Sequence, residues 1–186
     1  MSQARAGRRF EFRIDIGAPC AFVWEHLQDS RLRPAWDERV VSYDPIQPGP
    51  TAKGSRFRVA FKVFGLASLV ELECITWSPP HHSAVRAVRF GRGSLFAAQG
   101  GSWQLKAKDG EVTEWISRIH MEARGPARIA RAVERAAGDY LAWLAEKSQE
   151  SFRQLVEARW RERVQGAEGF VRRAPAPAAI IYESEG

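Results

Sequence analysis

The first two thirds of the chain alternate apolar and polar residues with the two-residue period of β-strands. Phe10, Phe12, Ile14 and Ile16 alternate with charged residues, so this first strand buries one face only. Turn residues then divide the chain into six further strand-like segments. We expect these strands over residues 41–43, 56–63, 70–74, 84–90, 95–105 and 112–121.

Helical periodicity occurs in two places. Two short helices are expected between the first two strands, the first of them opening at Pro19, because proline suits a first helical turn. After Gly125-Pro126, apolar residues recur at three- and four-residue steps and predict one long amphipathic helix to about Val164. The fold class is therefore α+β, in which a seven-stranded antiparallel sheet covers the apolar stripe of the C-terminal helix.

The opening of the chain is similar to that of a known superfamily. The residues concerned are Ile16-Gly17-Ala18-Pro19, Val23-Trp24, Leu27, Asp29, Pro34, Trp36-Asp37 and Val40. Together they resemble the opening of the START-like, Bet v-like helix-grip superfamily (SRPBCC). Within it, the polyketide cyclase/dehydrase and lipid-transport branch looks closest. The resemblance covers about Phe10 to Arg163 and implies a sheet curled around the long helix, with a cavity between them. Members range from carriers to cyclases, so function has to come from the cavity.

Composition narrows the class of protein. The 186 residues are 45% hydrophobic and 27% charged, which is typical of one globular domain. We expect the domain over 10–165, after an N-terminal arm (1–9) and before a flexible tail (166–186) that holds a Pro-Ala linker and the apolar triplet Ile180-Ile181-Tyr182. We expect this tail to be dispensable for the fold.

Charge and cysteine content exclude several functions. The net charge of +6 is spread without a dense basic run, which argues against nucleic-acid binding. No segment is apolar enough for a membrane span, and no apolar signal region follows the first arginines, so a cytoplasmic protein is expected. Cys20 and Cys74 lack metal-site spacing, and the adjacent pair His81-His82 has no further ligands, so we expect neither a metal nor another cofactor.

Strand phase selects the residues that line the expected cavity. Because Arg56, Arg58, Glu71 and Glu73 point outward, the residues between them point inward. The predicted ligand-binding residues are Phe57, Val59, Phe61, Val70, Leu72, Cys74, Trp115, Ser117 and Ile119 from the sheet, with Tyr140 and Leu144 from the helix. Such a surface binds an apolar molecule through the hydrophobic effect, at about 25 cal/mol per Å².

Few residues in this cavity suit acid-base chemistry. The catalytic candidates are Arg89, His26, Tyr140 and Ser117. Arg86 and Arg89 are three residues apart on one strand, so they face opposite sides unless a bulge intervenes. His120 is expected on the outer face. A helix histidine exposed to solvent is the simpler interpretation of His26.

The sequence leaves three functions open. The favoured one is binding of a hydrophobic small molecule, lipid-like or polyketide-like, between the sheet and the helix. The first alternative is an aromatase/cyclase that promotes aldol closure and dehydration in the same cavity. The second alternative is a protein-interaction module that forms a homodimer through the long helix and the tail. Converging ionisable groups would favour the enzyme, a dry apolar cavity the carrier, and a filled core the interaction module.

Overall fold

The computed structural model describes residues 7–92, 94–109 and 111–173, so the tail beyond Arg173 and the first six residues lie outside it. The elements, in order, are β1 (Arg8–Ile16), α1 (Cys20–Gln28), α2 (Arg33–Trp36), β2 (Val40–Pro45), β3 (Arg56–Val63), β4 (Leu66–Ser78), β5 (His82–Phe90), β6 (Phe96–Ala107), β7 (Thr113–Ala123) and α3 (Ala127–Arg173).

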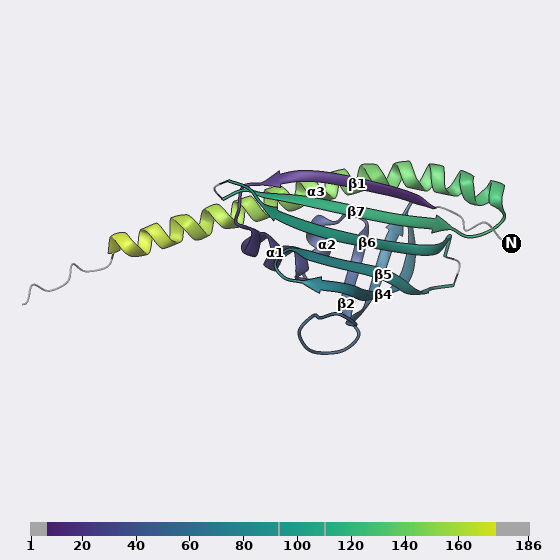
Figure 1. Cartoon of the computed structure of the whole chain (residues 1–186), viewed down its shortest axis with the longest axis horizontal. Helices are drawn as coiled ribbons and strands as arrows, with labels where there is room; N and C mark the ends of the chain where they lie inside the picture. The colour runs from purple at the N-terminus through teal and green to yellow at the C-terminus, as the bar shows by residue number, and fades with distance from the viewer. Residues whose placement is uncertain (1–6, 93, 110, 174–186) are drawn as a thin grey trace, which may run out of the picture.

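All seven strands form one antiparallel sheet in the order β1-β7-β6-β5-β4-β3-β2. Helix α3 lies along one face of this sheet, with α1 and α2 beside it (Figure 1). The chain order of strands and helices follows from the two periodicities of the sequence, and the expected α+β fold is confirmed.

Register confirms the predicted faces of the strands. Phe57 of β3 pairs with Leu72 of β4, and both side chains are buried. Their sequence neighbours Arg56 and Glu73 pair on the opposite, outer face. A slip of one residue would expose the whole apolar set, so the alternation fixes the register.

A β-bulge explains the irregular pattern of β5. The pairing with β4 shifts by one residue between Glu71 and Leu72, so that Glu71 pairs with Arg89 and Glu73 pairs with Arg86. The extra residue turns both arginines to the outer face, where each lies within 4 Å of a glutamate. Arg89 therefore does not enter the space between the sheet and α3.

The main core forms where α3 meets the short helices and the sheet. Phe152 of α3 is fully buried, and its ring centre lies 4.8 Å from that of Trp36 and 5.0 Å from that of Trp115. A smaller apolar cluster near the start of α3 contains Phe96, Met121 and Leu141. The aromatic residues of the opening motif thus pack the short helices onto the sheet and α3.

Helix α3 continues to Arg173, past the end near Val164 that the sequence predicts. A glycine inside a helix costs about 1 kcal/mol relative to alanine and does not by itself end the helix, which accounts for the difference at Gly166. The distal part of α3 extends beyond the sheet (Figure 1). No helix in the described ranges is both long and apolar enough to cross a membrane.

Candidate ligand cavity beside a buried arginine and aspartate cluster

Two small cavities lie between the sheet and the short helices α1 and α2, and no described residue of α3 is part of either lining. The first has a volume of about 50 Å³, and its lining includes Phe61, Leu72 and Ile119. The second has about 20 Å³, and its lining includes Phe57 and Cys74. Four residues line both cavities: Arg33, Tyr43, Val85 and Trp103. The residues shared by the two cavities therefore define the centre of the candidate site.

A short helix and the turn after it place three charged residues together. Arg33 opens α2 and Asp37 ends it, so the two side chains are one helical turn apart. Arg33 Nε donates a 3.1 Å hydrogen bond to Asp37 Oδ2. Arg39 donates hydrogen bonds to both oxygens of the same carboxylate from Nε and from a terminal nitrogen, each at 2.8 Å. The cluster of Arg33, Asp37 and Arg39 is anchored to α3, where Ser148 Oγ lies 3.3 Å from Asp37 Oδ1.

Aromatic rings surround the guanidinium of Arg33. Its central carbon lies 4.3 Å from the ring centre of Trp36, 4.7 Å from that of Trp103 and 5.9 Å from that of Tyr43. The residue is only 7% exposed. A planar cation stacked in this way is attracted to the ring faces and is held in one orientation.

The cluster carries one carboxylate and two guanidinium groups, all largely buried. Burial alone raises the pKa of Asp37, but the charges of Arg39 and Arg33 and the hydrogen bonds from Arg39 outweigh it and hold the pKa at about 2. Desolvation lowers the pKa of Arg33, and the Asp37 carboxylate opposes that shift. At neutral pH the cluster therefore has a net charge of +1 beside the 50 Å³ cavity, which both arginines line.

Tyr43 is the second ionisable group shared by the two cavities. Burial raises the pKa of its hydroxyl to about 12, although Arg33 opposes the shift. The phenol is thus protonated at neutral pH and can donate a proton or a hydrogen bond into the site. Arg33 and Tyr43 together give the site a cation and a neutral acid.

The structure separates the predicted ligand-binding residues into three groups. Phe61, Leu72, Ser117 and Ile119 line the larger cavity, and Phe57 and Cys74 line the smaller one. Val59, Val70, Trp115 and Leu144 are buried in the core and line neither cavity. Tyr140 also lines neither cavity, and its ring stacks on that of the exposed Phe64 at 4.5 Å.

The four catalytic candidates do not converge. Arg89 is on the outer face with Glu71. His26 lies on α1, where its Nδ1 is 2.8 Å from the carbonyl oxygen of Phe22, and it lines neither cavity. Ser117 alone lies in the larger cavity. His120 is on the outer face, as expected.

Sequence reasoning missed the charged cluster. Arg33 opens a four-residue helix and Asp37 is the residue directly after it, and so short a helix shows no period. The available signal was local: two arginines flank Asp37 at i−4 and i+2, next to Trp36. Charges spaced in this way beside a tryptophan that packs in the core indicate a buried, paired group.

Thiol and metal chemistry have little support among the described residues. Cys20 and Cys74 are free thiols, and burial raises the pKa of each. Cys20 Sγ lies 3.7 Å from His81 Nδ1, but no group of three or more metal-ligating side chains gathers in the described part of the chain.

Comparison with known proteins identifies the family. The family model for polyketide cyclase / dehydrase and lipid transport matches residues 8–157. Among solved structures, TTHA0849 of Thermus thermophilus is 15% identical, with a TM-score of 0.68 over 81% of this chain and 98% of that one. The Zhui aromatase/cyclase of Streptomyces sp. R1128 is 18% identical, with a TM-score of 0.65 over 86% and 97%.

A third solved structure, a START superfamily protein of Mycobacterium smegmatis, is 12% identical with a TM-score of 0.62 over 84% of this chain and 99% of that one. A search of curated proteins finds no match. At these identities the structural matches concern the fold alone. The family model covers most of the chain, and the chain therefore belongs to the polyketide cyclase / dehydrase and lipid transport family.

Proposed function

We propose that the chain binds a hydrophobic small molecule, lipid-like or polyketide-like, on the helix-covered side of the sheet, and that Arg33 holds an oxygen atom of this ligand. The observation that carries the proposal is the net positive charge of the buried cluster. Asp37 already has Arg39 as a bidentate partner, so Arg33 is not needed to neutralise it. Burying a second cation costs several kcal/mol, which a carbonyl, enolate or carboxylate oxygen of a ligand would offset.

The rest of the site supports an apolar body for that ligand. Beside Arg33 and Arg39, the apolar part of the lining of the larger cavity consists of Val40, Phe61, Leu72, Val85 and Ile119. When an apolar chain or ring packs against these side chains, an oxygen atom at its end can contact Arg33. The apolar part of the ligand is then buried and its polar atom is hydrogen-bonded.

The cavity must widen to admit such a ligand. About 50 Å³ is far below the roughly 300–1,000 Å³ of sites that bind drug-sized molecules. Tyr43 and Phe61 are only partly buried, and both belong to the strands β2 and β3 at one edge of the sheet. We propose that these two side chains swing outward on binding, because they lie next to the end of the sheet, where the edge strand β2 is paired on one side only.

A catalytic role as an aromatase/cyclase is the second candidate. Arg33 and Tyr43 line the same two cavities, so an enolate stabilised by the guanidinium and a proton donated by the phenol could act on one substrate. The small volume of the cavities favours instead the second alternative of the sequence analysis, an interaction module with a filled core. The buried cation supports ligand binding over the interaction module, because a core that is only closely packed is not stabilised by an additional buried charge.

The experiment uses the neutral apolar dye N-phenyl-1-naphthylamine, whose fluorescence rises in apolar sites. Leu72→Glu and Ile119→Glu place a charge in the lining of the larger cavity and should abolish dye binding or unfold the protein. Leu69→Glu on the same strand is the control, because Leu69 is 54% exposed. Undiminished dye affinity in folded Leu72→Glu and Ile119→Glu proteins would refute the proposal.

A further inference from the structure

A large trough lies on the outer face of the sheet, on the side away from α3. Its volume is about 680 Å³, and it runs along β6. The outward positions of β6 are small here: Ala98, Gly100 and Ser102. Cross-strand pairing places Gly100 between the long side chains of Arg86 and His120, and it places Ser102 between Ala84 and the long side chain of Arg118. Missing side chains on a central strand thus produce the trough.

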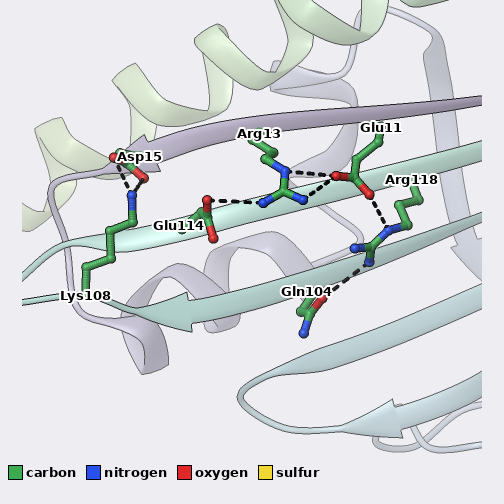
Figure 2. A network of polar contacts seen from close by, with 7 residues as sticks. All are labelled: Glu11, Arg13, Asp15, Gln104, Lys108, Glu114 and Arg118. Atoms are coloured by element: carbon green, nitrogen blue, oxygen red, sulfur yellow. Dashed lines mark hydrogen bonds and ion pairs between the residues drawn. The ribbon is translucent and has the colours of Figure 1, made fainter.

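The charged residues of the trough are mainly basic. Arg9, Arg86, Arg118 and His120 line it, and Glu11 is the single acidic residue in the lining. Figure 2 shows how Glu11 is occupied: it accepts hydrogen bonds from Arg13 at 2.6 and 2.8 Å and from Arg118 at 2.7 Å. These bonds lower the pKa of Glu11. The carboxylate is therefore neutralised, and positive charge remains for an incoming group.

Two of the cations are positioned to meet a ligand. Glu11 fixes Arg118 at Nε, and Gln104 accepts a 3.3 Å hydrogen bond from one terminal nitrogen, so the planar group is held beside the trough. Arg9 is exposed and forms no ion pair with another described residue. A guanidinium can stack on an aromatic ring and also pair with an acidic group.

The shape of the trough favours a ring system over a peptide. Strand β6 is paired on both sides, with β5 and β7, so it offers no free backbone groups to an added strand. The two walls stand two strand spacings apart, roughly 10 Å, which accommodates a flat ring between them. A volume of about 680 Å³ lies within the usual range for small-molecule sites.

We propose that this trough is a second binding site, specific for a planar aromatic anion such as an aromatic sulfonate or carboxylate, and independent of the inner cavity. The ring lies over Gly100 and Ser102, and the acidic group pairs with Arg9 or Arg118. The two sites lie against the same strands, so their linings share Val85, Gln99, Gly100, Gly101, Arg118 and Ile119. The trough alone is lined by Arg9, Glu11, Arg86, Ser102 and His120.

The probe is 8-anilinonaphthalene-1-sulfonate, titrated into the full-length protein and followed by fluorescence. Ser102→Phe fills the trough and should weaken binding about tenfold or more, which corresponds to roughly 1.4 kcal/mol. Lys106→Phe is the matched control, since Lys106 lies outward on the same strand but outside the trough. Arg9→Gln should weaken binding about two- to fivefold, and higher salt should reproduce part of that loss.

Arg56→Gln is the control for Arg9, because Arg56 is an exposed outward arginine of β3 away from the trough. Unchanged affinity in folded Ser102→Phe, or equal losses in Arg9→Gln and Arg56→Gln, would overturn the proposal. Loss of the probe in folded Leu72→Glu with retention in Ser102→Phe would place the probe in the inner cavity and overturn only this second site. A dimer that Ser102→Phe dissociates would make the trough an interface between copies and would also overturn it.

Discussion

Asp37 accepts hydrogen bonds from Arg39 on both of its carboxylate oxygens, each at 2.8 Å. This bidentate pair is buried, and Arg33 and Ser148 complete the surroundings of the carboxylate. The relationship separates the roles of the two arginines. Arg39 neutralises Asp37 and ties the α2–β2 turn to the core, whereas Arg33 adds a second buried cation beside the same carboxylate.

Removal of Arg33 should affect stability much less than removal of Asp37. In Arg33→Met the carboxylate keeps Arg39, and the apolar side chain fills the space among the rings, so we expect the free energy of unfolding to change by about 1 kcal/mol or less. Asp37→Ala leaves two buried cations without a partner and should cost about 3–5 kcal/mol. Urea unfolding of the two variants measures both values. Equal losses would show that Arg33 serves the fold rather than a ligand.

Acid should destabilise the protein through Asp37. Its pKa of about 2 in the folded state lies below the ordinary value of 3.8, so the carboxylate contributes stability that is fully present above about pH 4 and is lost as the pH falls toward 2. The shift corresponds to about 2 kcal/mol. Thermal melting of the wild type and of Asp37→Asn across this pH range isolates the contribution. The difference in melting temperature between the two should shrink as the pH falls, and a constant difference would argue against the linkage.

The packing of α3 on the sheet depends on Phe152. Because this ring is fully buried between Trp36 and Trp115, Phe152→Ala should lower the free energy of unfolding by about 3–5 kcal/mol. Trp143→Ala on the same helix is the control, since Trp143 is 52% exposed, and it should change stability by about 0.5 kcal/mol or less. Comparable losses in both would mean that α3 is seated differently on the sheet.

Much of this arrangement is readable from the sequence, and the reasons are local. The alternation around Phe57 and Leu72 predicted their burial because a strand has only two faces. The bulge in β5 was left open, since a single extra residue changes the face of Arg89 without altering composition. The cluster at Asp37 was missed because its partners depend on how a four-residue helix meets β2 and α3.

The contacts at the distal end of α3 could not be predicted from the sequence either. Trp160 and Arg163 make its distal contacts with the rest of the domain: the Trp160 ring lies 5.0 Å from that of Phe22, and its Nε1 donates a 2.9 Å hydrogen bond to Glu111. These contacts depend on where the β6–β7 turn and α1 end in space, and the helical period of α3 does not reveal those positions.

Truncation separates the distal helix from the tail. A chain that ends after Gly166 keeps the contacts of Trp160 and Arg163, so its melting temperature should stay within about 2 °C of the full chain. A chain that ends after Arg159 loses them and should melt roughly 2–6 °C lower. A large decrease in the melting temperature of the first truncation would show that the tail is part of the core. An unchanged melting temperature with altered dye affinity would show that the tail acts as a lid.

The central claim is that Arg33 holds the oxygen of a hydrophobic ligand inside the fold. The most direct measurement is the affinity of wild type and Arg33→Met for dodecanoic acid, determined by displacement of N-phenyl-1-naphthylamine. A charge-assisted hydrogen bond contributes about 1.5–3 kcal/mol, so the variant should bind the acid at least about tenfold more weakly while its affinity for the neutral dye stays close to that of the wild type. Equal affinities for the acid in the two folded proteins would contradict the claim.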